Sequence, residues 1–137
     1  MKDKLNAGVI GLGVGESHIL GLQSHPRCEV IALCDLNKEV LKKVGQKYPK
    51  YHLTNDPISI LDDARIDLVC LASFDNFHEE QVLRALRNNK HVFVEKPLCL
   101  SIQELINIKN QLNSQPHLSL SSNHILRKTP RFIELRD

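Results

Sequence analysis

Short apolar runs alternate along the chain with longer segments whose apolar residues recur at helical spacing. The runs that predict strands cover residues 7–10, 30–34, 51–53, 67–72, 91–94 and 117–121. The segments that predict helices are residues 15–24, the stretch after a cap at Asn37, a short turn opened by Asp56-Pro57, residues 76–88, and the stretch after a capping box at Ser101 and Glu104. Because nearly continuous apolar strands separated by helices are typical of sheets covered on both faces, the pattern predicts an α/β fold with a doubly wound, mostly parallel sheet.

Composition and charge narrow the class of protein further. The 137 residues suffice for a single domain with a substantial core. The net charge of +2 comes without a block of Lys or Arg, so we expect no nucleic-acid partner. No apolar run is long enough to span a bilayer, and no leader sequence is recognisable, so we expect no membrane association. The four cysteines lie far apart, which predicts reduced thiols, a cytoplasmic location and no metal site.

A glycine-rich loop follows the first predicted strand and opens the first predicted helix. Glycines let an anionic pyrophosphate approach the backbone, and the helix that follows presents its free N–H groups to the phosphate. A strict G-x-G-x-x-G motif would have its third glycine where this chain has Glu16, which we expect to point to solvent. The alternative is a glycine-rich turn without a ligand, but the strand-loop-helix context predicts a Rossmann fold and dinucleotide binding. The expected cofactor contacts in this loop are Gly11, Leu12, Gly13, Val14 and Gly15.

Asp35 directly follows the second predicted strand. A Rossmann domain has at this place the carboxylate that accepts hydrogen bonds from the adenosine ribose, and the next residue, Leu36, is expected to line the same site. A carboxylate here repels the extra phosphate of NADP, and no Arg follows it, although Lys38 lies nearby. The sequence therefore predicts NAD as the cofactor, with NADP less favoured. The alternative is that Asp35 only ends the strand.

Residues after the fourth and fifth predicted strands form a pattern that is found in a known protein family. Asn76 and His78 follow the fourth strand, and Glu95-Lys96-Pro97 follows the fifth. In order and spacing they resemble the Asn, the His and the Glu-Lys-Pro triplet of the Gfo/Idh/MocA oxidoreductases, and Asn123 and Arg127 look like that family's Asn and Arg near the domain crossover. The resemblance covers essentially the whole chain and implies the N-terminal NAD(P)-binding Rossmann domain of a two-domain enzyme.

The resemblance implies that Lys96 is catalytic and lies beside the nicotinamide and the substrate hydroxyl. Hydride leaves a carbinol carbon as the hydroxyl proton is removed, and a cation stabilises the developing alkoxide. The alternative is a surface lysine paired with Glu95. His18 is expected to have a structural or cofactor-packing role. Ser73 and Phe74 end the fourth strand at the edge where ligands bind, so we expect both to contact the cofactor. Further contacts implied by the resemblance are Asn76, His78, Glu95, Lys96 and Asn123.

These expectations define an organisation and a function. Residues 1–122 are expected to form the dinucleotide-binding domain, and residues 123–137 a crossover and the start of a helix leading to a substrate domain that the chain lacks. The resemblance implies hydride transfer between NAD(P) and a hydroxyl carbon of a sugar, inositol or nucleotide-sugar by a full-length homo-oligomer, with the fragment alone inactive. The alternatives are a non-catalytic NAD-binding sensor or regulatory module, and a Rossmann domain for S-adenosylmethionine or a flavin dinucleotide.

Overall fold

Six parallel strands form one sheet in the computed structural model, which describes residues 3–136 and omits the side chains of residues 132 and 136. The strands are β1 (Leu5–Ile10), β2 (Cys28–Cys34), β3 (His52–Thr54), β4 (Leu68–Leu71), β5 (His91–Glu95) and β6 (Leu120–Asn123). Their order is β3-β2-β1-β4-β5-β6, so the winding reverses between β1 and β4. A crevice for a ligand forms at the carboxyl ends of the strands where such a reversal occurs. The predicted doubly wound parallel sheet is confirmed.

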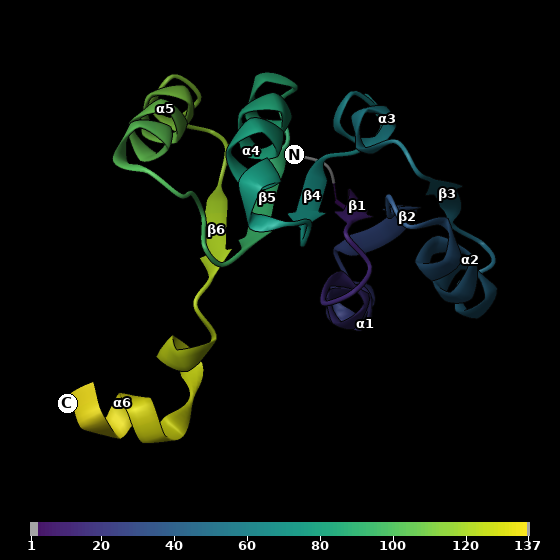
Figure 1. The fold of residues 1–137 in the computed structure, drawn as a ribbon, viewed down its shortest axis with the longest axis horizontal. Coiled ribbons are helices and arrows are strands. Elements are labelled where there is room, and N and C mark those ends of the chain that lie inside the picture. The colour runs from purple at the N-terminus through teal and green to yellow at the C-terminus, as the bar shows by residue number, and fades with distance from the viewer. Residues whose placement is uncertain (1–2, 137) are drawn as a thin grey trace.

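The helices cover both faces of the sheet. Helices α1 and α2 lie on one face, and α3, α4 and α5 lie on the other (Figure 1). Short 3-10 turns, η1 (Asp75–Phe77) and η2 (Ile125–Lys128), precede α4 and α6. Helix α6 lies apart from the sheet (Figure 1). The helices are α1 (Gly15–Ser24), α2 (Lys38–Lys47), α3 (Pro57–Leu61), α4 (His78–Arg87), α5 (Ile102–Asn113) and α6 (Pro130–Arg136).

Side-chain caps fix where several helices begin. The side chains of Asn37, Asp56 and Ser101 accept hydrogen bonds from backbone N–H groups in the first turns of α2, α3 and α5, as the sequence predicts. The capping box at α5 differs in one detail, because Glu104 accepts the N–H of Leu100 at 2.6 Å and not that of Ser101. Within residues 3–136, none of the helices combines the length and the apolar character that crossing a bilayer requires.

Two apolar cores lie on opposite faces of the sheet. Full burial of each large aliphatic side chain contributes about 1.5–3 kcal/mol, so these layers dominate the stability of the domain. The core under α3, α4 and α5 includes Leu61, Val69, Leu71, Val82, Leu86 and Val94. The core under α1 and α2 includes Val9, Ile19, Val30, Leu33 and Val44.

The last strand begins later than the sequence predicts. A turn closed by the N–H of Leu118 and the carbonyl of Gln115 delays the strand, and β6 runs from Leu120 to Asn123 and not over residues 117–121. The ring of His117, expected in the strand, donates to the Oδ1 of Asn89 at 2.5 Å. Asn123 therefore lies within the sheet, paired with Glu95 of β5.

Candidate functional site

A cleft of about 700 Å³ opens at the carboxyl edge of the sheet, where the strand order reverses. The loops after β1, β2 and β4 form its walls, so residues far apart in the sequence face one another across it. This volume lies within the range of pockets that hold small molecules and cofactors. The predicted site residues that line it are Gly11, Gly13, Val14, Asp35, Leu36, Ser73 and Phe74.

The glycines of the first loop have two separate roles. Gly11 adopts a φ of +87°, and a Cβ atom there would lie 2.3 Å from the carbonyl oxygen of Ala72. The close approach of the loops after β1 and β4 therefore requires glycine at this position. A Cβ atom on Gly13 would meet nothing within 4 Å among the described residues. Gly13 thus leaves open space over the backbone, which is what a closely approaching phosphate needs.

Glu16 turns away from the cleft, but it does not extend into open solvent as predicted. Its Oε1 accepts a hydrogen bond from Lys47 Nζ at 2.6 Å, which joins α1 to α2. This bond raises the pKa of Lys47. The carboxylate that stands where a strict motif has glycine is thus neutralised by a cation from the neighbouring helix, and it does not repel an anion in the loop.

Asp35 links the loops after β1 and β2. Its Oδ2 accepts the backbone N–H of Leu12 and its Oδ1 accepts the backbone N–H of Asn37, both at 2.8 Å. An ionised carboxylate has about four acceptor sites, so Asp35 can still accept bonds from hydroxyl groups in the cleft. Open backbone at Gly13 beside a carboxylate with spare acceptor capacity fits the pyrophosphate and ribose of a dinucleotide.

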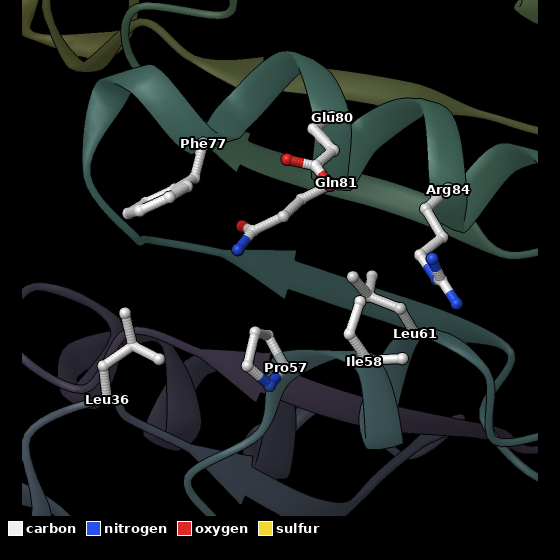
Figure 2. A pocket seen from close by; sticks show the side chains of 8 residues that line it. All are labelled: Leu36, Pro57, Ile58, Leu61, Phe77, Glu80, Gln81 and Arg84. Carbon is white, nitrogen blue, oxygen red and sulfur yellow. The ribbon is translucent and has the colours of Figure 1, made fainter.

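A smaller pocket of about 210 Å³ lies beside the cleft, between α3 and α4. Figure 2 shows Phe77 and Gln81 reaching across it toward Leu36 and Pro57. The same residues also line the main cleft, so the two spaces adjoin. The sequence analysis missed Pro57, Phe77 and Gln81. Their position just after the caps and strand ends that bound the cleft is the signal that would have identified them.

A second group of site residues lies at the ends of β5 and β6. Glu95 is buried, and its Oε1 accepts hydrogen bonds from His18 Nε2 at 2.6 Å and from Asn123 Nδ2 at 2.8 Å. Burial raises the pKa of the Glu95 carboxyl, but the bonds from Asn123 and His18 outweigh burial and hold that pKa below its ordinary value. The carboxylate therefore stays ionised, and within the described residues it is not paired with the Lys96 ammonium.

Comparison with known proteins agrees with this geometry. Residues 5–124 match the Gfo/Idh/MocA family, which is described as an oxidoreductase family with an NAD-binding Rossmann fold. The chain belongs to the Gfo/Idh/MocA family. The predicted resemblance is confirmed, as is NAD as the cofactor that this family binds.

Curated relatives of this Gfo/Idh/MocA chain include inositol dehydrogenases. It is 31% identical over 102 residues to myo-inositol 2-dehydrogenase of Thermotoga maritima, a match that covers 74% of this chain and 30% of the relative. It is also 31% identical over 106 residues to scyllo-inositol 2-dehydrogenase (NAD(+)) of Bacillus subtilis, covering 76% of this chain and 31% of that protein. The chain thus spans about 30% of the length of these relatives.

Solved structures show the same fold. The myo-inositol 2-dehydrogenase of Lactobacillus plantarum superposes with a TM-score of 0.87 at 24% identity, covering 97% of this chain and 40% of that one. The scyllo-inositol dehydrogenase of Lactobacillus casei with bound NAD(H) and scyllo-inositol gives a TM-score of 0.86 at 22% identity, with the same coverage.

The remaining family-motif residues lie in different surroundings. His78 of the Gfo/Idh/MocA motif is fully buried, with Nδ1 2.6 Å from the carbonyl oxygen of Pro97 and Nε2 3.0 Å from that of Ser73. It supports the loop after β4 against the turn that follows Lys96, and it does not face the cleft. The Lys96-Pro97 peptide bond is cis. Asn76 and Arg127 are exposed on η1 and η2.

Lys96 itself has an exposed side chain at the carboxyl end of β5. No ion pair joins it to Glu95 in the part of the chain that the structure describes, so the alternative interpretation as a Glu95-paired surface lysine is not supported. The same described part contains no group of three His, Cys, Asp or Glu side chains that could hold a metal ion.

Proposed function

We propose that this Gfo/Idh/MocA domain binds NAD across the cleft, with the pyrophosphate over Gly13 and the adenosine ribose on Asp35. Open space at Gly13 beside the Asp35 carboxylate is the observation that carries the proposal. The flat adenine ring then lies between Leu36 and Phe77 (Figure 2). The Nε2 of Gln81 can donate a hydrogen bond to it, since the Oε1 of Gln81 already accepts one from Ser73 Oγ at 2.6 Å.

The nicotinamide half lies toward the ends of β5 and β6 in this proposal. Bound NAD supplies the hydride acceptor or donor, and the protein supplies position and charge. In reduction, the exposed Lys96 ammonium donates a proton to the substrate oxygen as hydride arrives at its carbon; in oxidation, the neutral Lys96 amine accepts the hydroxyl proton as hydride leaves. Glu95, already satisfied by His18 and Asn123, leaves the Lys96 ammonium free for this role.

We further propose that the whole protein transfers hydride between NAD and a hydroxyl carbon of a polyol. Inositols are the favoured substrates, ahead of sugars and nucleotide-sugars. The inositol dehydrogenases among its relatives support this substrate class. The segment after β6 leads to the domain that binds the polyol, since η2 and α6 lie apart from the sheet (Figure 1).

Ligand titration of the purified chain tests cofactor binding. A ligand at one hundred times its Kd adds about 2.7 kcal/mol of stability, so NAD should raise the unfolding temperature clearly, and NADP less at equal concentration. S-adenosylmethionine and flavin adenine dinucleotide serve as competing ligands. No shift with millimolar NAD, or an equal shift with S-adenosylmethionine, would overturn the proposal.

Replacing Lys96 in the full-length protein separates an enzyme from a binding module. Lys96→Met should reduce turnover of an inositol by about 10²–10⁴-fold, the usual contribution of a proton-transferring group, while the Kd for NAD changes little. The exposed Lys109 offers a matched control, Lys109→Met, which should leave turnover unchanged. Full turnover in Lys96→Met would overturn the catalytic role of Lys96, whereas a wild-type protein that binds NAD but turns over no polyol would favour a sensor or regulatory module.

A further inference from the structure

Three side chains from distant elements converge at the point where β5 turns into the Glu-Lys-Pro segment. His18 comes from α1, Glu95 ends β5, and Asn123 ends β6. The carboxylate oxygen Oε1 of Glu95 accepts both hydrogen bonds, at 2.6 Å from His18 and 2.8 Å from Asn123. We call this group the Glu95 network.

The His18 ring is fixed from a second side. It meets the ring of Phe93 edge to face, with centroids 5.2 Å apart and planes inclined by 70°. Only 20% of the His18 side chain and 9% of the Glu95 side chain remain exposed. The network is therefore a largely buried contact between α1 and β5, and not an exposed surface pair.

Stability alone gives a weak reason for this arrangement. Burying a carboxylate is costly, and apolar residues of similar volume often stabilise such a site equally well. Glu95 is, however, the residue directly before Lys96, so bonds that hold its side chain also hold the backbone from which the Lys96 side chain extends. The network thus acts on the residue that carries the reactive ammonium.

We propose that His18 is a positioning residue, which through Glu95 fixes the Glu95–Lys96 turn against the nicotinamide half of the cofactor. Because His18 lies on the helix that begins at the glycine loop, the network also joins the pyrophosphate site to the nicotinamide site. This inference rests on the proposed NAD binding. It assigns no proton transfer to His18 and requires only that the ring donates to Glu95.

Comparing NAD with ADP-ribose tests the proposal. ADP-ribose lacks the nicotinamide, so the ratio of the two dissociation constants reports only on the nicotinamide end. In His18→Leu, which keeps bulk and removes the donor, the Kd for NAD should rise about ten-fold while the Kd for ADP-ribose changes less than about two-fold. His18→Gln, whose amide can donate to Glu95, should restore most of the NAD affinity.

Two further variants keep the test sharp. Glu95→Leu removes the acceptor at similar bulk and should reproduce the selective loss of NAD affinity if His18→Leu fails to fold. His52→Leu replaces an exposed histidine on β3 and should leave both dissociation constants unchanged. If wild type binds no NAD, the proposed function falls and this inference with it. If wild type binds NAD but the folded variants weaken both ligands equally, or neither, only the positioning role is overturned.

Discussion

At the scale of single residues, the glycine loop divides its work between folding and binding. Gly11 is enclosed by the backbone of Ala72 and Ser73, whereas Gly13 faces open space among the described residues. The sequence motif predicts both glycines equally well and cannot separate the two roles. The distinction appears only when the loop after β4 is placed against the loop after β1.

Alanine at Gly11 should therefore mainly reduce stability, whereas alanine at Gly13 should mainly weaken NAD binding. Gly11→Ala places a side chain at a positive φ, which alone costs about 1–3 kcal/mol, and adds a Cβ that overlaps the Ala72 carbonyl. The free energy of unfolding should therefore fall by at least that amount. Gly13→Ala should change stability little and weaken NAD binding, because the added methyl group occupies the pyrophosphate approach. Urea unfolding and calorimetric titration measure the two effects. Gly21→Ala in α1, also in open space, is the control that should not weaken NAD binding.

Asp35 should determine both affinity and cofactor preference. Asp35→Asn places an amide donor against the N–H of Leu12 or Asn37 and removes the charge that repels NADP. We expect NAD affinity to fall about 10–100-fold, which is the usual contribution of hydrogen bonds to a charged group. The ratio of NAD affinity to NADP affinity should also decrease. Asp3→Asn, at an exposed residue outside the cleft, should change neither. An unchanged NAD affinity in Asp35→Asn would contradict the assigned role.

At the scale of secondary-structure elements, a buried lysine joins α3, β4 and β5. Lys90 is 1% exposed, and its Nζ donates to the carbonyl oxygens of Asp63 at 2.6 Å and Ile66 at 2.9 Å. Burial lowers the pKa of Lys90 despite the nearby carboxylates of Asp63, Asp67 and Asp62. No sequence pattern indicates this role, since a lysine after Asn88-Asn89 is typical of an exposed turn and lysines are rarely fully buried.

Removing the Lys90 ammonium should weaken the contact between these elements. Lys90→Met fills similar volume but leaves the carbonyl oxygen of Ile66 without a donor among the described residues, and that of Asp63 with only the N–H of Ile66. We therefore expect a loss of about 2 kcal/mol in the free energy of unfolding. The matched control Lys43→Met, exposed on α2, should stay within about 0.5 kcal/mol of wild type. Equal stability of both variants in urea would show that water replaces the ammonium at no cost.

The same loop should respond to acid. The hydrogen bonds from Arg65 lower the pKa of Asp63 to about 2, below the ordinary 3.8. A depressed carboxyl pKa stabilises the fold above 3.8, and this contribution is lost as pH falls from about 4 to about 2. Asp63→Asn should therefore be less stable than wild type at pH 6, and the difference should shrink near pH 2. A constant difference across this range, measured by chemical unfolding at each pH, would contradict the assignment.

At the scale of the whole molecule, the sequence predicts the architecture better than the site. The alternation of apolar strands and helices predicts the parallel sheet, and side-chain caps locate the helix starts, so local patterns suffice for both. The strand order is set by tertiary pairing and comes only from the structure. The spacing of apolar residues does not show which face of α5 packs on the sheet. Ile108 is buried there, but Ile102 and Leu105, which are also apolar, are exposed. The bond between His18 and Glu95 joins residues 77 positions apart, and no local pattern carries that information.

The cysteines report on the integrity of the whole domain. Burial raises the pKa of Cys34 and of Cys70 to about 12, with the charges of Asp35 and Glu95 adding to the respective shifts. Both thiols should therefore resist alkylation until the domain unfolds, while the partly exposed Cys99 reacts first. Mass spectrometry of the native protein under limiting iodoacetamide measures this order. Early labelling of Cys70 would show that the sheet opens locally.

The strand order has one more consequence. Gly13 and Asp35 follow β1 and β2, whereas Phe77 and Gln81 follow β4, so the cleft is shared by two halves of the chain that the sheet joins along the β1–β4 seam. A peptide that carries only the glycine loop would lack the residues after β2 and β4 that complete the cleft. Nucleotide affinity is thus a property of the assembled sheet, and a titration doubles as an assay of whether the two halves have joined.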